Sequence, residues 1–510
     1  MNKSVKYKYI PKNYNHSILL KIHSPNKEDY KPKEYKVYQL LAMIYELYPM
    51  QENQRLLYGD YTYISATKLK HLFGNDYKAT VDWLINADVF KTDNQYINDK
   101  KCKGFSFTDK YADSIPKKVT ICKGSLVRKL SQKSNSSYAT EKKYDFLYKY
   151  LDGLEIDVEG ASDCAWSMYK QDMLEYSSKI AKYELKVANA NYKSKSLRKP
   201  ANPIVRLTVG LDNINRIDNK DFVFTQDSTA YRLHTNLTNI KSELRNYISY
   251  KSQQIVSVDV CNSQPFKTST FLGPVFWETD ATATAEMEEK ILKKGLKPQI
   301  LTKSDIIFNK FNNNIITSNN PFSYTSYIMF TKTGIPSVSV AVPDDIQRYI
   351  DLCQSGGLYK FLSKEMELKQ QGIVDIDGRS VKAAVFQVLF TDNRFLGQAD
   401  AKPKRIFKEL FPNVYDILFH IKRKDSTVLP IALQTIESTI ILDRVAKRIS
   451  TERPNLFIAT IHDSVATTVG NEDYVEQVMR EEMMMAIGLE PSFKVEYWSA
   501  DNPIIIKKTA

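Results

Sequence analysis

Cysteine and histidine are scarce in this chain of 510 residues, and neither forms a cluster. The 6 histidines are scattered, and no Cys-x-x-Cys pair occurs. These absences argue against a disulfide scaffold and against a structural zinc site, and they favour a reducing compartment. The cysteines are Cys102, Cys122, Cys164, Cys261 and Cys353.

Long apolar runs and a P-loop are also missing. No stretch approaches the roughly 20 apolar residues that span a bilayer. The first residues, MNKSVKYKYIPKNY, lack the apolar core of a signal peptide. We therefore expect a cytoplasmic protein with no membrane partner. The absence of the Walker A pattern argues against a motor that hydrolyses nucleotide on a P-loop.

The residues that are abundant describe a basic globular protein. Hydrophobic residues make up 43% of the chain and aromatic residues 12%, which is enough for a large buried core. Lys and Arg number 72 against 59 Asp and Glu, which gives a net charge of +13. This excess favours a polyanionic partner. The basic residues are dispersed and form no basic tail.

Residues 36–112 have the pattern of a small domain that follows an N-terminal arm, 1–35. Apolar residues recur at helical spacing in three segments, and two short alternating segments follow them. Three helices and a two-stranded wing form the winged-helix pattern, which binds DNA in some proteins and a protein partner in others. The expected elements are helices over 38–47, 65–73 and 76–89 and strands over 95–97 and 104–107.

The turn of this expected wing is basic. Lys100, Lys101 and Lys103 are therefore the candidates for contacts with DNA phosphates. If the domain binds protein instead, a replication protein is the expected partner.

A long amphipathic helix is expected over 166–187, with a linker over 189–203. From 161 to 200 there are eight Lys and Arg against four Asp and Glu. A solvated helix face is the ordinary explanation of such a charge pattern. A helix that follows a nucleic-acid backbone is the alternative.

Three motifs in the second half of the chain could carry chemistry. In the first, the apolar strand Ile255-Val-Ser-Val ends at Asp259, where a carboxylate could hold a divalent ion. In the second, two β-rich runs flank His462 and Asp463, which we expect at a hairpin tip. Taken singly, each aspartate is more often a cap or turn residue.

The third motif is a helix with cations and rings on one face. Helical spacing places Lys382, Phe386 and Phe390 on that face, with Arg379 a turn earlier. Arg and Lys could bind a triphosphate while a ring meets the base. An ordinary amphipathic helix with core Phe residues is the alternative.

Together the three motifs resemble motifs A, B and C of the family A polymerases, the group of bacterial DNA polymerase I and the single-subunit phage RNA polymerases. Lys382-x3-Phe386-Gln-Val-Leu-Phe390 is similar to the motif B of the family. Three further segments follow the family in the same order, so the resemblance covers about 225–498. They are Tyr231-Arg232-Leu-His-Thr-Asn236-Leu-Thr-Asn239, Leu433-Gln434-Thr-Ile and the tail from 473 to 498.

The resemblance implies two-metal phosphoryl transfer on a DNA primer–template. Asp259 and Asp463, with the Val260 carbonyl, would hold two Mg²⁺ ions, which Mn²⁺ could replace. Lys382 would bind the triphosphate of a deoxynucleotide and protonate the leaving pyrophosphate. The other implied contacts are Arg379 with the triphosphate, Phe386, Phe390 and Gln264 with the base and sugar, and His462, Arg232, Asn236, Asn239 and Gln434 with primer and template.

The implied fold is α+β, a right-hand polymerase of palm, fingers and thumb behind a winged-helix domain. The implied setting is replication of a phage or mobile element, or repair, in a bacterial or phage-infected cytoplasm. Asp157-Val-Glu159 has the form of an exonuclease motif, but too little chain follows it for a nuclease domain. The expected divisions are a thumb-like helical region over 113–224, palm over 225–274 and 401–510, and fingers over 275–400 with an insertion at 275–350.

The choice of sugar is where the motifs disagree. Ser464 follows His462-Asp463, as in the RNA enzymes, where the DNA enzymes carry Glu. Gln264 stands where the DNA enzymes place a Glu that blocks a ribose hydroxyl, and Phe390 has no hydroxyl to sense one. We expect a DNA polymerase without proofreading. An RNA polymerase or primase, or an inactive DNA-binding replication initiator, are the alternatives.

Overall fold

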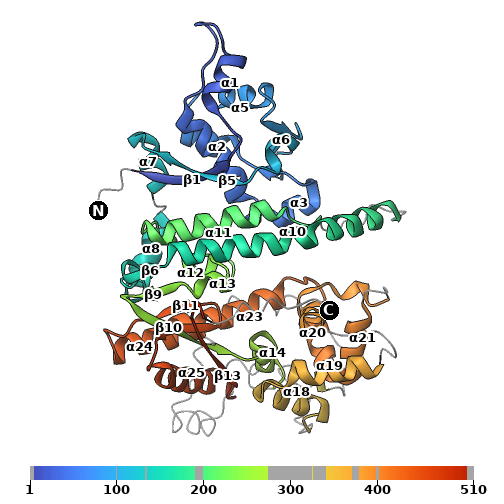
Figure 1. Ribbon diagram of the computed structural model, residues 1–510. Helices are drawn as coiled ribbons and strands as arrows, with labels where there is room; N and C mark the ends of the chain where they lie inside the picture. Colours follow the sequence, from blue (N-terminus) through green and yellow to red (C-terminus); the bar gives the residue numbers. More distant parts are fainter. Residues whose placement is uncertain are drawn as a thin grey trace.

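The computed structural model describes residues 5–98, 100–132, 135–189, 199–273, 324–325, 341–369, 378–397 and 401–501. Figure 1 shows three layers: an N-terminal domain, two long helices that run side by side beneath it, and a larger part that combines a sheet with helices. Of the predicted insertion at 275–350 the structure describes 324–325 and 341–350, and most of the predicted linker lies outside the described residues.

Residues 5–35 belong to the N-terminal domain and do not form a separate arm. Strand β1 (Lys6–Pro11) pairs antiparallel with β5 (Pro116–Ile121). Ile10 and Tyr14 are buried in the same hydrophobic core as the helices that follow. The predicted boundaries at 35 and 112 are therefore wrong, because β1 and β5 form one two-stranded sheet although more than 100 residues separate them in the sequence.

The three predicted helices are confirmed. Ser65 caps the second by accepting a hydrogen bond from the Lys68 amide, and Gly74, at φ 82°, ends it. The helices of this domain are α1 (His16–His23), α2 (Glu34–Leu47), η1 (Pro49–Gln51), α3 (Glu52–Tyr58), α4 (Ala66–Phe73), α5 (Tyr77–Asn86), α6 (Asp109–Ala112) and α7 (Gly124–Ser131).

The sheet of this domain differs from the predicted wing. It has the order β2 (Thr62–Tyr63), β4 (Gly104–Phe107), β3 (Phe90–Thr92). The strand predicted at 95–97 is wrong, because Phe90 enters the core whereas Tyr96 is 69% exposed. Ile97 forms only a single bridge, to Lys101. Assignment of this domain as a winged helix remains a prediction.

Lys101 is not available to a phosphate. Its ammonium group forms an ion pair with Asp93 at 2.6 Å and donates to the Gln95 side chain at 2.9 Å. The side chain is 1% exposed, because it closes the loop that precedes β4. The prediction of DNA contact is therefore wrong for Lys101, whereas Lys100 is exposed and Lys103 half-buried.

Two long helices separate the N-terminal domain from the rest of the chain (Figure 1). The helix predicted over 166–187 is confirmed and longer, since α10 spans Val158–Asn189. Asp157 accepts a hydrogen bond from the Gly160 amide, so the exonuclease-like Asp157-Val-Glu159 is the capped start of this helix. Helix α11 (Pro203–Asp218) packs along α10.

The N-terminal domain meets α11 through buried charges. The Lys8 ammonium donates to Glu46 at 2.6 Å, and Lys6 donates to Asp221. Asp212 and Arg216 of α11 interact with the same groups. Burial opposes the charge of Lys8, but Glu46 and then Asp212 outweigh it and raise its pKa. The interface therefore depends on complementary charge.

Replacing Lys8 by Met should lower the free energy of unfolding by about 2–3 kcal/mol, because it removes the cation bonded to Glu46 and leaves Arg216 alone to offset the buried charges of Glu46 and Asp212. Urea unfolding measures the change. The matched control is Lys91→Met, whose ion pair with Asp109 has side chains 51% and 96% exposed. That control should cost at most about 0.5 kcal/mol. Equal losses in the two variants would contradict a buried charge network.

The central sheet of the larger part is built around β10 (Gln253–Val260). Its first residues pair with β9 (Ile248–Tyr250), and its last residues lie between β12 (Ser464–Thr468) and β13 (Phe493–Tyr497). Strand β11 (Ala459–Ile461) extends the sheet beyond β12, and β6 (Leu154–Ile156) extends it beyond β9. All these pairs are antiparallel.

Helices cover this sheet and form a group beside it (Figure 1). The helix and strand predicted at the end of the chain are confirmed as α25 and β13. The helices beside the sheet are α14 (Ser263–Thr268), α18 (Asp344–Gln354), α19 (Leu358–Lys369), α20 (Gly378–Phe390), α21 (Lys402–Leu410) and α22 (Pro412–Ile421). Those nearest the sheet are α23 (Val428–Ser438), its π-helical continuation η8 (Thr439–Ala446), α24 (Lys447–Glu452) and α25 (Glu472–Ile487).

Two predicted divisions of this part differ from the structure. Residues 154–156, expected in a thumb-like region, supply strand β6 to the central sheet. Residues 402–421, expected in the palm, pack with α18, α19 and α20. The remaining short elements are α8 (Asn135–Lys143), α9 (Asp145–Tyr148), η2 (Leu151–Gly153), β7 (Phe224–Gln226), β8 (Leu233–Thr235), α12 (Asn236–Asn239), α13 (Ser242–Arg245), η3 (Ser269–Phe271) and η6 (Asn393–Phe395).

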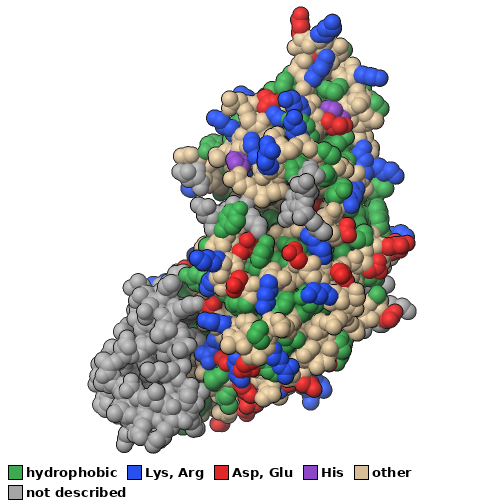
Figure 2. Space-filling model, turned by 90° about the vertical axis from the view of Figure 1, so that its left-hand side faces the viewer, with side chains coloured by type: hydrophobic (Ala, Val, Ile, Leu, Met, Phe, Trp, Pro, Cys, Tyr) green, Lys and Arg blue, Asp and Glu red, His purple; other side chains and the backbone are tan. Residues whose placement is uncertain are grey.

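The surface shows no broad region of one charge on the face drawn in Figure 2, where basic and acidic side chains are interspersed. On this face, the basic side chains that contribute to the net charge of +13 are dispersed among acidic ones. Among the residues that the structure describes, no helix is long and apolar enough to cross a membrane.

Candidate active site

The central sheet brings the two predicted aspartates together. The predicted hairpin is confirmed, since Ile461 pairs with Ser464 and leaves His462 and Asp463 as its two-residue tip. Ser464 also pairs with Asp259 in β10. Asp463, the residue before Ser464, therefore lies close to Asp259. Two carboxylates that lie 204 positions apart in the sequence thus meet at one end of two neighbouring strands.

The proximity of the carboxylates changes their electrostatics. Burial and the charge of Asp463, with a smaller contribution from Glu496, raise the pKa of Asp259 to about 7. Lys267 and Lys494 act in the opposite direction but do not outweigh them. A buried carboxylate beside another of like charge is in an unfavourable position unless a cation is shared between them.

This donor set fits a hard divalent cation. Among the described residues, no group of three or more His, Cys, Asp and Glu side chains is arranged to hold a metal ion. Mg²⁺ does not require such a group, because it binds through one or two carboxylates and completes its shell with water and substrate phosphates. Asp259 and Asp463 therefore fit Mg²⁺ better than a structural metal. The Val260 carbonyl, next to Asp259 at the end of β10, is the predicted third ligand.

The backbone around the aspartates is strained at three positions. Tyr231, Asn262 and His462 have φ angles of 58°, 50° and 56°, in the left-handed region that side chains other than Gly seldom adopt. Asn262 turns the chain from β10 into α14, and His462 occupies the hairpin tip. Such conformations persist where the surrounding structure enforces them, and they are enriched at functional sites.

A buried charge network that the sequence did not reveal lies beside these residues. Glu437 of α23, 1% exposed, accepts hydrogen bonds from Arg232 at 2.6 Å and from Lys267 at 2.6 Å. Gln264 donates its side-chain amide to the same carboxylate at 2.7 Å. The only signal in the sequence is that Glu437 is the single charged residue between Val428 and Leu442.

The network holds Glu437 in its charged form. Burial opposes ionisation, but Lys267 and then Arg232 outweigh it and lower the pKa of Glu437. Lys267 is fully buried and completes the ion pair from α14. The network therefore joins α14, α23 and the segment before β8, the three elements around the aspartates.

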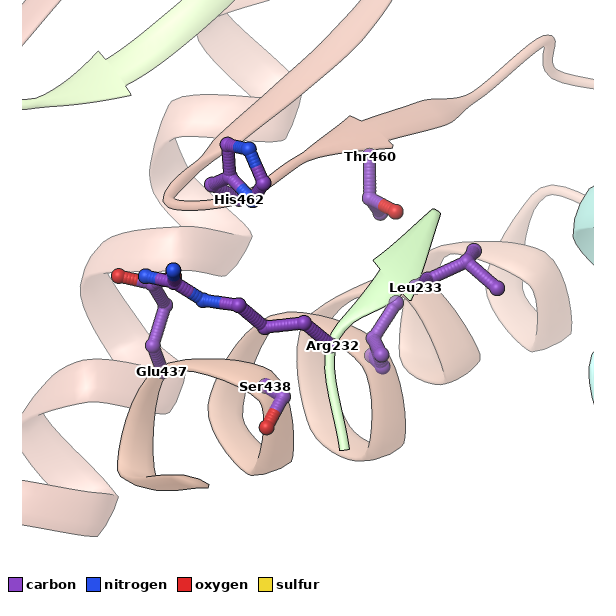
Figure 3. Close-up of a pocket in the computed structure, with 7 residues that line it drawn as sticks. Arg232, Leu233, Glu437, Ser438, Thr460 and His462 are labelled. Atoms are coloured by element: carbon purple, nitrogen blue, oxygen red, sulfur yellow. The ribbon is translucent and has the colours of Figure 1, made fainter. Parts of the chain in front are cut away.

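His462 closes a small pocket above this network (Figure 3). The pocket is lined by Arg232, Leu233, Glu437, Ser438, Leu442, Thr460 and His462. In Figure 3 the Arg232 side chain extends across the pocket floor towards Glu437. Burial and the nearby Arg232 lower the pKa of His462, so its ring is neutral at physiological pH.

Four buried polar atoms around the site have no hydrogen-bond partner among the residues that the structure describes. They are Arg232 Nε, Asn262 Nδ2, Gln264 Oε1 and His462 Nδ1. Each unpaired buried group costs about 1–3 kcal/mol, which a ligand could recover. The set contains both donors and acceptors, so it suits a ligand that carries oxygen acceptors and at least one hydroxyl or amino donor.

The structure separates the other predicted primer–template residues. Asn236 is 1% exposed, and its side chain bonds the Val223 amide at 2.7 Å and the Asp221 carbonyl at 3.2 Å. Its prediction as a DNA contact is therefore wrong, because the side chain is committed to the adjoining loop. Asn239 is exposed, and Gln434 is half-buried in α23, one turn before Glu437.

Helix α20 carries the predicted triphosphate face. Lys382 is exposed, with its ammonium 5.6 Å from the Phe386 ring centre. Phe386 and Phe390 are half-buried with ring centres 5.1 Å apart, so the three side chains share a face as predicted. Arg379 begins this helix, but its side chain lies outside the described residues. Helix α20 packs on α19, α21 and α23, and α23 in turn packs on α14, the helix that follows Asp259.

Comparison with known proteins adds little to this geometry. No protein-family model matches the chain, and no curated protein does. Among solved structures, the chain is similar to the POL domain of Pol1 from M. smegmatis, determined in complex with DNA primer-template and dNTP. The two are 13% identical, with a TM-score of 0.31, over 74% of this chain and 73% of the other. Because a TM-score this low does not establish a common fold, the case for a function depends on the residues of the site.

Proposed function

We propose that the chain is a template-directed nucleotidyltransferase, and specifically a DNA-dependent DNA polymerase without a proofreading nuclease. The observation that carries this proposal is that the strand pairing of Asp259 with Ser464 brings Asp259 and Asp463 close together, beside buried polar atoms that lack partners among the described residues. Paired carboxylates beside unsatisfied donors suit a metal-bound phosphate ester better than they suit an apolar ligand.

In this proposal Asp259 and Asp463, with the Val260 carbonyl, would hold two Mg²⁺ ions. When bound, these ions lower the pKa of the primer 3′-hydroxyl and neutralise charge on the leaving pyrophosphate. Arg379 and Lys382 bind the triphosphate, and Lys382 donates a proton to pyrophosphate as it leaves. Phe386 and Phe390 of α20 frame the base and sugar.

His462, Arg232 and Gln434 hold the primer end against the sheet. Arg232 reaches the site from the segment before β8, and its Nε has no partner within the described part of the chain. Its guanidinium is already fixed by Glu437, so little side-chain entropy is lost when it binds DNA. The proposed setting is replication of a phage or mobile element, or DNA repair, with the N-terminal domain binding DNA or a replication protein.

A second candidate is an RNA polymerase or primase with the same site. Ser464 favours it, because its buried hydroxyl bonds the Ile461 carbonyl and provides no third acid beside the two aspartates.

Primer extension on one template, with dNTPs in one reaction and NTPs in the other, tests the proposal. We expect extension with dNTPs that depends on both template and primer. Preferential use of NTPs, or synthesis without a primer, would identify the second candidate. Retained DNA binding without any incorporation would identify an inactive DNA-binding initiator.

A further inference from the structure

The contact between Gln264 and Glu437 leaves one half of an amide group unused. Gln264 stands five residues after Asp259, at the start of α14. Its Nε2 donates to Glu437 Oε2 at 2.7 Å. Its Oε1 is buried and has no partner in the described ranges of the chain. The protein thus fixes Nε2 by a hydrogen bond, whereas Oε1 can accept a hydrogen bond from a ligand.

The orientation of this amide follows from the charge of Glu437. An ionised carboxylate accepts hydrogen bonds and cannot donate one, so only the NH₂ group of Gln264 can face it. Lys267 and Arg232, each 2.6 Å from this carboxylate, keep it ionised. A turn of the amide by 180° would place two acceptors against each other. Oε1 must therefore point away from Glu437.

An unpaired buried acceptor needs a donor from the ligand, and a nucleotide offers few. Its triphosphate oxygens are acceptors at neutral pH. The amino and imino donors of its base are used in pairing with the template. The hydroxyl groups of the sugar are the donors that remain.

We propose that Glu437 is a positioning residue, which turns the Gln264 amide so that Oε1 accepts a hydrogen bond from a sugar hydroxyl of the bound nucleotide. This inference rests on the proposed nucleotidyltransferase function. It adds to the sugar contact already implied for Gln264 the carboxylate of α23 that orients its amide, whichever hydroxyl the nucleotide carries.

Fluorinated nucleotides test the inference, because fluorine is similar in size to a hydroxyl and cannot donate a hydrogen bond. The full chain is bound to a template and a dideoxy-terminated primer, so that the nucleotide binds without transfer. The Kd of ATP is compared with that of 2′-fluoro-ATP, and the Kd of dATP with that of 3′-fluoro-dATP. We expect one analogue to bind about 5–10-fold more weakly than its parent, which matches one hydrogen bond. That analogue identifies the hydroxyl.

Two substitutions should abolish the difference between hydroxyl and fluorine. Gln264→Met keeps the length of the side chain and removes the acceptor. Glu437→Gln lets the Gln264 amide turn either way, although it also leaves Lys267 and Arg232 partly unpaired. The matched control is Lys267→Met, which breaks one ion pair of the same network and leaves the Arg232 ion pair with Glu437 in place. The control should lower thermal stability and keep the hydroxyl-to-fluorine ratio.

Equal affinity of parent and analogue at both positions in the wild-type chain would overturn the inference. An unchanged ratio in Gln264→Met would overturn it as well. The inference would also be overturned if the hydroxyl-to-fluorine affinity ratio changed as much in Lys267→Met as in Glu437→Gln. The network would then support only the fold and would not orient the Gln264 amide. Failure of all four nucleotides to bind would overturn the proposed function together with the inference.

Discussion

Asp463→Asn should reduce nucleotide incorporation by about 10³-fold or more, while affinity for primer–template stays within about threefold of the wild-type value. Asp463 lies at the hairpin tip directly beside Asp259. Its amide replacement keeps the shape of the tip and removes the charge that the metal ions require. Single-turnover primer extension measures the rate, and fluorescence anisotropy of labelled primer–template measures the affinity.

The control for this prediction is Asp473→Asn, which removes a carboxylate from the exposed start of α25. That variant should incorporate nucleotide at the wild-type rate. The Asp259→Asn/Asp463→Asn pair should be hardly slower than either single variant, because the two carboxylates act as one unit. Wild-type rates in both single variants would show that the aspartates do not carry the chemistry.

Asp259→Asn should make the metal-free protein more stable at pH 8, by about 2–4 kcal/mol in the free energy of unfolding. The pKa of Asp259 is raised to about 7 by burial and by Asp463. The folded state therefore binds a proton more tightly than the unfolded state does. Proton binding to Asp259 therefore stabilises the folded state, and this stabilisation is fully present below the ordinary pKa of an Asp, near 4. It is lost as pH rises through 7. Urea unfolding in EDTA at pH 8 and pH 5 measures the difference, which should fall to about 1 kcal/mol at pH 5.

Addition of Mg²⁺ should narrow the difference in stability between the two proteins. At ten times its Kd, the ion should stabilise the wild-type chain by about 1.4 kcal/mol, because only the folded state brings the carboxylates together. Asp259→Asn should show little response to the ion. A variant less stable than the wild-type chain in EDTA at pH 8 would contradict the unfavourable charge pairing at this site.

Local patterns in the sequence located most of the elements that carry the site. The apolar run before Asp259, the two β-rich runs around His462 and the apolar spacing of 378–390 each describe a strand, a hairpin or a helix, because backbone pairing and helical periodicity are local. The same reasoning placed α4 between its Ser cap and its Gly stop. It failed where pairing joins distant segments, as in β1 with β5.

The wrong residue assignments share one cause, which is burial. Lys101 and Asn236 were predicted to contact DNA because of their residue type and neighbours. In the structure, Asp93 pairs with Lys101, and the Val223 amide and Asp221 carbonyl bond Asn236. A side chain that satisfies its own loop cannot also contact a ligand. Burial depends on which segments fold over a residue, and a local pattern does not contain that information.

The sequence by itself determined the chemistry that the site can offer: two carboxylates after apolar strands, and a helix face of cations and rings. Tertiary structure decided how these groups act together. Antiparallel pairing of β10 with β12 brings Asp463 beside Asp259, which raises the pKa of Asp259. Packing of α14 on α23 buries Glu437 between Lys267 and Arg232 and turns the Gln264 amide. Electrostatic effects of this kind depend on the distance between charges and on their burial. Both are set only when segments that are far apart in the sequence come into contact.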